Sequence, residues 1–391
     1  MPALVIHADR ILTPLEDLAD SVIIVEDGRI TGVGHRDEVR VPAGAADYVA
    51  RGLTAVPGFV DIHLHGAGGH DVMEAGPAEL RTIARTLARF GTTSFVATTV
   101  TAPKDLTCRS LSGLARYIAS DSNRVAGSVC CAEVLGIHLE GPFISPARRG
   151  VHPPGAIAKP SVPLLEKFFD AARGAVRILT LAPELPGALE LVDLAVARGI
   201  LVALGHTDAT YAQACAAIEH GVRHAVHVFN AMRPFSHRET GVLGAVLTDS
   251  RVTAEIIADG VHVDAPAVQL LRAAKGSELV LLVTDATAAT AMPDGKYRLG
   301  QVGVTVRGGV CRNREGKLAG STLTLDRAVR HMVALGVPLL EAVQMATLHP
   351  ARRLGIAGKK GILAAGSDAD VVLLTPDLQI SGVLARGVGL A

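Results

Sequence analysis

Residues 57–66 read Pro57-Gly58-Phe59-Val60-Asp61-Ile62-His63-Leu64-His65-Gly66. This apolar run, interrupted by single polar residues and closed by a glycine, predicts a strand over residues 55–65. Side chains two residues apart in a strand point to the same face, so His63 and His65 can both reach one cation. Such a pair in isolation is as consistent with a plain polar patch. The choice between the two interpretations therefore depends on the rest of the chain.

Seven further strand-like runs follow, and helix-like segments alternate with them. We predict these strands at residues 92–99, 134–140, 175–182, 200–206, 224–229, 252–258 and 279–285. Residues 77–90 are typical of the helices, because apolar side chains recur there at helical spacing and Gly91 follows as a suitable C-terminal cap. Eight strands alternating with helices predict an α/β protein with a (β/α)8 barrel of the TIM type.

Both ends of the chain read as short strands outside this alternation. The runs are residues 3–8, 21–26 and 29–33 at one end, and 369–375 and 380–386 at the other. We expect the two ends to pair in one small β-sandwich domain. The predicted domains are therefore residues 1–56 with 358–391 for the β-sandwich, and residues 57–357 for the barrel.

The charge and hydropathy of the chain make some classes of binding partner poor candidates. Lys plus Arg and Asp plus Glu both number 38, which gives a formal net charge of zero, so nucleic acid and anionic membranes are poor candidates. The apolar stretches are short and broken by Gly, Pro or charge, so we expect no membrane span. The N-terminus lacks the pattern of a signal peptide, and the five cysteines form no paired framework. These features predict a soluble protein of the cytoplasm.

Metal-capable side chains recur at or near the C-terminal ends of the later strands. They are Glu140, His206, His227 and Asp285. In a barrel these strand ends meet at one mouth, where the histidine pair of the first strand also lies. Imidazole nitrogens and carboxylate oxygens suit zinc or ferrous iron, and a catalytic site keeps an open position for water. The pattern predicts a metal-dependent hydrolase with five ligands and a base.

The blocks around these residues follow one another in a characteristic order. They are the opening stretch at 57–66, His-Leu-Glu-Gly-Pro-Phe at 138–143, Gly-His-Thr at 205–207, His-Val-Phe-Asn-Ala-Met at 227–232, Ala-Asp-Gly-Val-His at 258–262 and Thr-Asp-Ala at 284–286. Further blocks lie at 346–351 and 366–370. Together they resemble the amidohydrolase superfamily, and specifically the N-acetylglucosamine-6-phosphate deacetylase family, over nearly the whole chain.

The resemblance implies a role for each site residue. Glu140, His206 and His227 would hold the main metal, His63 and His65 a second ion, and Asp285 would be the general base and acid. Some relatives lack the histidine pair and use one metal, so the number of ions stays open. The residues implied in substrate binding are His152, Asn230, Ala231, Arg238, His262 and Leu323. Arg238 would reach the site of the neighbouring subunit in a homodimer.

The implied reaction is hydrolysis of N-acetylglucosamine 6-phosphate to glucosamine 6-phosphate and acetate. The divalent metal would be zinc, with iron, manganese or cobalt as alternatives. N-acetylgalactosamine 6-phosphate stays open as the substrate, because one contact can decide between the epimers. Ring opening or deamination would predict a carboxylated lysine or another histidine set. A catalytically inactive binding protein is a third alternative, which the intact ligand set disfavours.

Overall fold

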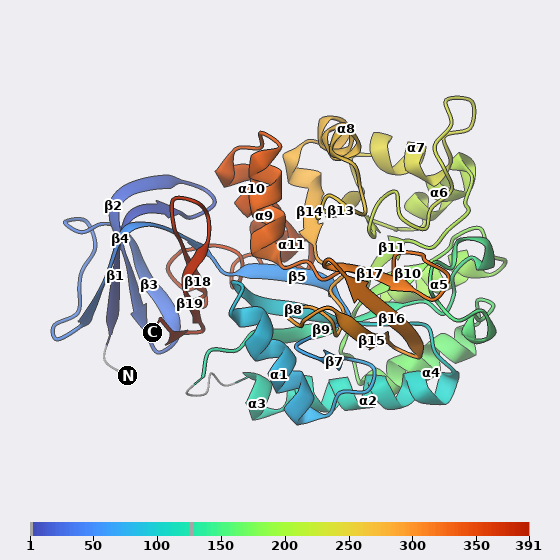
Figure 1. Ribbon diagram of the computed structural model, residues 1–391, viewed down its shortest axis with the longest axis horizontal. Helices are drawn as coiled ribbons and strands as arrows, with labels where there is room; N and C mark the ends of the chain where they lie inside the picture. Colours follow the sequence, from blue (N-terminus) through green and yellow to red (C-terminus); the bar gives the residue numbers. More distant parts are fainter. Residues whose placement is uncertain (1–2, 125–128, 391) are drawn as a thin grey trace.

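The computed structural model describes residues 3–124 and 129–390 of the chain. Figure 1 shows two groups of strands side by side, one wrapped by helices and a smaller one that contains both ends of the chain. The predicted site residues lie in the larger group.

Eight parallel strands form the barrel in the predicted order. They are β5 (Phe59–Leu64), β8 (Thr92–Thr99), β9 (Glu133–Glu140), β10 (Val176–Leu181), β11 (Leu201–Leu204), β12 (His224–Ala225), β13 (Thr253–Ile257) and β14 (Val280–Val283). The barrel closes where β5 meets the segment after β14: the Asp285 N–H donates to the His63 carbonyl at 2.9 Å, and the His65 N–H donates to the Ala286 carbonyl at 2.7 Å. The (β/α)8 prediction is confirmed.

Two barrel strands differ from the prediction by more than two residues at one end. Residues 55–57 belong to β4 (Ala46–Pro57) of the terminal sheet, and Gly58 separates them from β5. A Cβ at Gly58 would overlap the Thr93 side chain, so the close approach of the two strands requires glycine there. The strand β12 is much shorter than residues 224–229, because the backbone of His227 takes a φ of +29° and leaves the extended conformation.

Helices form the outer layer around the barrel strands (Figure 1). They are α1 (Pro77–Ala88), α2 (Lys104–Ala119), α3 (Asp121–Arg124), α4 (Val162–Ala172), α5 (Ala188–Ala197), α6 (Tyr211–Glu219), α7 (Gly241–Thr248), α8 (Ala265–Lys275), α9 (Leu325–Ala334), α10 (Leu339–Ala346) and α11 (Leu348–Arg353), with short 3-10 helices at Pro146–Arg148, Pro154–Ala156 and Ser277–Leu279. The predicted apolar stripe of α1, including Leu80, Ile83 and Leu87, is buried in the barrel core. Among the described residues, none of the helices has the length and apolar character needed to cross a bilayer.

The two ends of the chain pair in one sheet, as predicted. Its strands run in the order β20 (Val388–Gly389), β19 (Ile380–Ala385), β18 (Val371–Leu374), β4, β1 (Leu4–Leu12), β2 (Asp17–Glu26) and β3 (Arg29–His35). Ile30 of β3 and Leu384 of β19 lie near opposite edges of this order, yet they belong to one buried cluster. The sheet therefore folds over on itself around that cluster, which is the arrangement of a small β-sandwich. The exact domain boundaries stay a prediction.

A buried ion cluster connects the two groups of strands. The Lys360 ammonium lies 2.8 Å from Glu133 at the start of β9, and 2.9 Å from both Asp368 and Asp370 just before β18. Burial alone would lower the pKa of Lys360, but the three carboxylates outweigh it and raise that pKa. The cluster lies at the N-terminal end of β9, opposite to the end that carries Glu140.

A three-stranded antiparallel sheet was not predicted. It consists of β15 (Gly295–Leu299), β16 (Val302–Arg307) and β17 (Val310–Asn313), and a smaller hairpin joins β6 (Gly66–Ala67) to β7 (His70–Asp71). Leu299 and Val306 of the three-stranded sheet pack with Val100, which directly follows β8. This insertion therefore lies against the C-terminal mouth of the barrel.

Candidate active site

Glu140 is the centre of a cluster of histidines at the C-terminal mouth of the barrel. Its Oε1 lies 3.0 Å from Nε2 of His227, 3.2 Å from Nε2 of His206 and 3.5 Å from Nε2 of His63. Glu140 and His63 are almost completely buried. The ends of β5, β11 and β12 thus bring three imidazoles to one carboxylate oxygen.

The other oxygen of Glu140 faces a second group of side chains. Its Oε2 lies 3.5 Å from Nε2 of His65 and 3.6 Å from Nε2 of His152. Asp285 joins this side, since its Oδ1 lies 3.0 Å from Nε2 of His65 and 3.9 Å from Nε2 of His63. The six predicted metal-capable residues therefore form one cluster, which His152 borders.

The backbone directs several of these side chains into the mouth. His206, His227 and Asp285 each lie two residues beyond the end of a strand, with φ values of +48°, +29° and +50°. A positive φ is uncommon for residues other than glycine, and such strained positions concentrate at functional sites. At these three positions the chain leaves the sheet and turns the functional side chain into the cavity.

Electrostatics keep both carboxylates of the cluster ionised. Burial alone would raise the pKa of Glu140, but His63, His206 and His227 outweigh it and hold that pKa well below its ordinary value. The pKa of Asp285 is lowered in the same way, mainly by His65. Burial alone would lower the pKa of His63, yet its carboxylate neighbours raise it. The negative charge of the carboxylates therefore favours a cation at this cluster, either a proton on His63 or a metal ion in its place.

The donor atoms fit a divalent metal. Three groups of three side chains have donor atoms within 4.8 Å of one another: His63, Glu140 and His227; His63, His65 and Asp285; and Glu140, His152 and His206. Two atoms that bind one zinc at about 2.1 Å in a tetrahedron lie roughly 3.4 Å apart, and the contacts to Glu140 are close to that value. Nε2 of His63 is buried without a hydrogen-bond partner among the described residues. A metal ion would use this otherwise unpaired atom.

A cavity of about 230 Å³ opens onto the cluster. Nine of the predicted site residues line it: His65, Glu140, His152, His206, His227, Asn230, Ala231, His262 and Asp285. Within the cavity wall, Nδ1 of His262 lies 2.7 Å from the carboxylate of Asp259. Val100, Leu299 and Leu318 form an apolar wall of the cavity that was not predicted. Leu299 belongs to the inserted sheet and Leu318 follows that sheet in the sequence.

Three predicted site residues do not line this cavity. His63 lies beneath it, fully buried. Leu323 is also buried and packs in the barrel core. Arg238 is exposed on the segment before α7, and Figure 1 shows that segment extending away from the barrel. A single chain therefore does not bring Arg238 to its own cluster.

Glu255 contacts the cluster and was not predicted. It lies on β13, completely buried, and its carboxylate is 2.8 Å from Nδ1 of His63. The sequence contained one signal for it, a single acidic residue between Ala254 and Ile256 in an otherwise apolar strand. A buried carboxylate needs partners, so such a residue indicates a nearby donor even when the sequence does not identify it.

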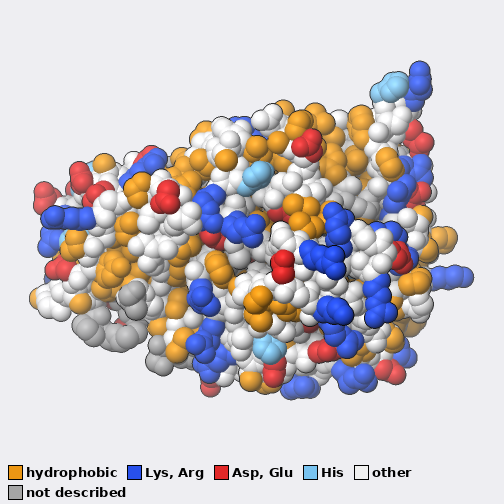
Figure 2. Space-filling model, viewed as in Figure 1, with side chains coloured by type: hydrophobic (Ala, Val, Ile, Leu, Met, Phe, Trp, Pro, Cys, Tyr) orange, Lys and Arg blue, Asp and Glu red, His pale blue; other side chains and the backbone are white. Residues whose placement is uncertain are grey.

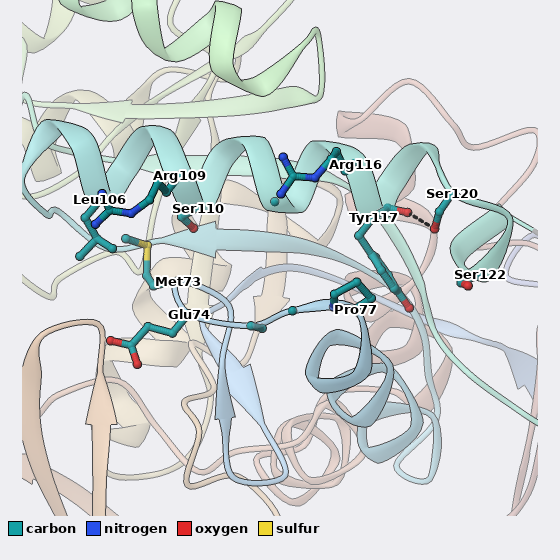
Figure 3. Close-up of a pocket in the computed structure, with 13 residues that line it drawn as sticks. Met73, Glu74, Pro77, Leu106, Arg109, Ser110, Arg116, Tyr117, Ser120 and Ser122 are labelled. Atoms are coloured by element: carbon teal, nitrogen blue, oxygen red, sulfur yellow. Dashed lines mark hydrogen bonds between the residues drawn. The ribbon is translucent and has the colours of Figure 1, made fainter.

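A larger groove of about 630 Å³ lies elsewhere, between α2 and the segment that leads into α1 (Figure 3). Arg109, Ser110 and Arg116 of α2 lie on one side of it, and Glu74 lies on the other. None of the described residues that line it is a histidine, and Glu74 is the single carboxylate among them. The chemistry that the sequence predicts is therefore confined to the smaller cavity.

Histidines and carboxylates gathered at the C-terminal mouth of a (β/α)8 barrel define the class of metal-dependent barrel hydrolases. Residues 54–388 match the model of the Amidohydrolase family, and the chain belongs to that family.

Similar proteins narrow the class further. The N-acetylgalactosamine-6-phosphate deacetylase of Escherichia coli O157:H7 is 38% identical, over 98% of this chain and 98% of its own length. The N-acetylglucosamine-6-phosphate deacetylase of Vibrio furnissii is 38% identical, over 97% and 93% of the two chains. A solved structure of a mutant N-acetyl-D-glucosamine-6-phosphate deacetylase from Mycobacterium smegmatis in complex with N-acetyl-D-glucosamine-6-phosphate is 39% identical, with a TM-score of 0.91 and coverage of 100% and 99%. Within the amidohydrolases, the chain belongs to the N-acetylglucosamine-6-phosphate deacetylase family.

Proposed function

We propose that this protein hydrolyses the acetamide of N-acetyl-D-glucosamine 6-phosphate to D-glucosamine 6-phosphate and acetate. The observation that carries the proposal is the position of Asp285, an ionised carboxylate 3.0 Å from His65 at the edge of the histidine cluster. The carboxylate of Asp285 lies beside a cluster that fits a metal ion, and that cluster faces a cavity. Asp285 can therefore exchange a proton with a reacting water. The names of the similar deacetylases support the choice of substrate.

The chain's own residues would hold one or two divalent ions. Glu140, His206 and His227 would hold the main ion, and His63 with His65 would hold a second. When bound, the metal would lower the pKa of a water toward about 7 and polarise the acetamide carbonyl. We propose zinc, with iron, manganese or cobalt as alternatives, since the nitrogen and oxygen donors accept all four.

Proton transfer falls to Asp285. Its ionised carboxylate accepts a proton from the attacking water and later delivers that proton to the amine nitrogen as the C–N bond breaks.

We assign a separate role to His152, as a hydrogen-bond donor to the substrate. Its Nδ1 accepts the Thr101 backbone N–H at 3.2 Å, so Nε2 of the neutral ring carries the proton. That N–H lies on the side of Glu140, whose Oε2 is 3.6 Å from Nε2, in the wall of the cavity. It would donate to the acetyl oxygen as negative charge develops there.

Recognition of the phosphate is assigned to Asn230, Ala231 and His262, which line the cavity, together with Arg238 of a second subunit. A guanidinium binds phosphate oxygens well because its N–H groups form a planar fork. Lys and Arg side chains also lie over the part of the surface occupied by β15–β17 (Figure 2), which favours the approach of an anionic substrate. We therefore propose a homodimer in which Arg238 reaches the neighbouring site, with Leu323 beneath the acetyl group.

Replacing Arg238 by Ala is expected to raise KM for the phosphorylated sugar about 10- to 100-fold, the loss of a charge-assisted contact to phosphate. Turnover of unphosphorylated N-acetylglucosamine should change little. The measurement is steady-state kinetics on both sugars, with Arg85→Ala as the control because Arg85 is exposed on α1. Equal losses on the two sugars would contradict the assignment of Arg238 to the phosphate.

A mixing experiment tests whether Arg238 acts across subunits. In a mixed dimer of Arg238→Ala with Asp285→Asn, one site combines an intact Asp285 with an intact Arg238 from the other chain. That site should recover a low KM. If Arg238 acted within its own subunit, no site of the mixed dimer would be intact, and the KM would stay high.

N-acetylgalactosamine 6-phosphate is the second candidate substrate, favoured by the similar deacetylase of that name. A comparison of kcat/KM for the two sugars on purified protein decides between them. We expect acetate release from both, with the higher kcat/KM for the glucosamine epimer. A higher value for the galactosamine epimer would reverse the substrate assignment and leave the mechanism intact. The binding-protein alternative predicts no release from either.

A further inference from the structure

Glu255 lies beneath the metal-binding cluster and contacts two of its members. Its Oε2 lies 2.8 Å from Nδ1 of His63, and it also accepts the backbone N–H of His227 at 3.2 Å. Its Oε1 lies 2.8 Å from Nε2 of His224. Glu255, His63 and His224 are completely buried. Both oxygens of one carboxylate therefore have fixed partners, two of which belong to the cluster.

His224 fixes the orientation of this carboxylate. Its Nδ1 lies 2.7 Å from the hydroxyl of Thr253, two residues before Glu255 on the same strand. The ring of His224 is thus held at both nitrogens, by Thr253 and by Glu255. Its place in the structure is to keep Glu255 in one orientation.

The contact with Glu255 determines which nitrogen of His63 faces the cluster. An ionised carboxylate only accepts hydrogen bonds, so Nδ1 of His63 must be the donor. Nε2 then faces Glu140 and Asp285, at 3.5 Å and 3.9 Å from their carboxylate oxygens. A metal ligand needs a free lone pair at that nitrogen. Outer carboxylates of this kind fix the tautomer and orientation of ligating histidines in metal sites generally.

The other histidines of the cluster have different outer partners. Nδ1 of His65 lies 3.0 Å from the carbonyl oxygen of Thr98, and Nδ1 of His206 lies 3.0 Å from that of Arg148. Nδ1 of His227 has no hydrogen-bond partner among the described residues. Among the Nδ1 atoms of these four histidines, that of His63 alone has a charged side chain as its partner in the part of the chain that the structure describes. Its support can therefore be removed by a single substitution.

We propose that Glu255 is a positioning residue that holds His63, and the backbone of His227, for the binding of a divalent cation on the His63 side of the cluster. The inference rests on the metal site of the proposed function and adds a residue to it. It concerns cation binding, which can be measured without a substrate.

The test is zinc binding by Glu255→Gln. Glutamine keeps the shape of the side chain, and its amide oxygen can still accept a hydrogen bond from Nδ1 of His63, but it removes the negative charge. Nε2 of His63 is then a weaker donor to a cation, because an outer carboxylate raises the basicity of a ligating imidazole. We expect zinc affinity, measured by competition with a chelating dye on metal-stripped protein, to fall about 10- to 100-fold for the ion on the His63 side. In a His63→Gln background the same substitution should have little further effect, because both act through one ligand.

The matched control is Asp370→Asn, which alters a buried carboxylate in the Lys360 cluster at the other end of the barrel. It should lower the urea midpoint of the metal-stripped protein and leave zinc affinity unchanged. Unchanged zinc affinity in Glu255→Gln would overturn the inference, as would a loss that is equally large in the His63→Gln background. A protein that binds zinc as expected but releases no acetate would refute the proposed function and leave this inference standing.

A measurement on the wild type covers the case in which Glu255→Gln does not fold. Histidine ring ¹⁵N shifts of the zinc-loaded protein report the tautomer, and His63→Gln assigns the signal. We expect a protonated Nδ1 and a metal-bound Nε2 for His63. A metal-bound or unprotonated Nδ1 would contradict the role given to Glu255.

Discussion

Asp285→Asn is expected to lower turnover about 10²- to 10⁴-fold while the metal content stays close to that of the wild type. Asparagine has the same size and can keep a contact with His65, but it cannot accept a proton from water. The carboxylate of Asp285 is held ionised, because the hydrogen bond and charge of His65 outweigh the effect of burial on its pKa. The substitution therefore removes the proton acceptor and leaves Glu140, His206 and His227 in place.

Two measurements are needed together, kcat for acetate release and metal per chain. The control is Asp294→Asn, a change of the same kind at an exposed aspartate on the loop before β15. It should retain both kcat and metal. Retained turnover in Asp285→Asn would mean that another residue moves the proton. A loss of metal equal to the loss of turnover would instead make Asp285 chiefly a ligand.

Glu140→Gln is expected to abolish tight metal binding and, with it, turnover. Glu140 is the single carboxylate within 3.2 Å of both His206 and His227 among the described residues. The neutral amide removes the negative charge of the carboxylate, whose two oxygens face the two groups of histidines. We expect zinc affinity to fall by more than the roughly 100-fold that the loss of an outer partner costs, since a direct donor is lost.

The chain offers a matched control for this substitution on the same strand. Glu133 begins β9 and Glu140 ends it. Glu133→Gln should weaken the contact with Lys360 and lower stability, without an effect on zinc affinity. Calorimetric zinc titration of the two metal-stripped variants measures the difference. Zinc affinity in Glu140→Gln equal to that in Glu133→Gln would contradict the central position given to Glu140.

The sequence was sufficient to predict the barrel because its strands are continuous apolar runs. Parallel strands are buried on both faces, and segments such as Thr92–Thr99 and Thr253–Ile257 are buried throughout. The ends of these runs also revealed most of the cluster. Glu140, His206 and Asp285 are polar residues at the point where an apolar strand stops, and barrel geometry brings such points together.

Other features depend on contacts between distant residues. Glu255 and His63 are 192 residues apart in sequence, and nothing near Glu255 indicates which side chain its carboxylate meets. Leu299 and Leu318 enter the cavity from the inserted sheet, whose position against the mouth is set by its packing on Val100. The strand β12 is short because His227 has a positive φ, and no pattern of residues in the sequence predicted that backbone conformation.

The proposed metal-dependent deacetylation is tested most directly by acetate release from N-acetyl-D-glucosamine 6-phosphate before and after metal removal. Purified protein loaded with zinc should release acetate and glucosamine 6-phosphate in equal amounts. The same protein stripped with a chelator should lose this turnover and recover it when zinc is restored. No acetate from the zinc-loaded protein, or undiminished release from the stripped one, would contradict the proposed function.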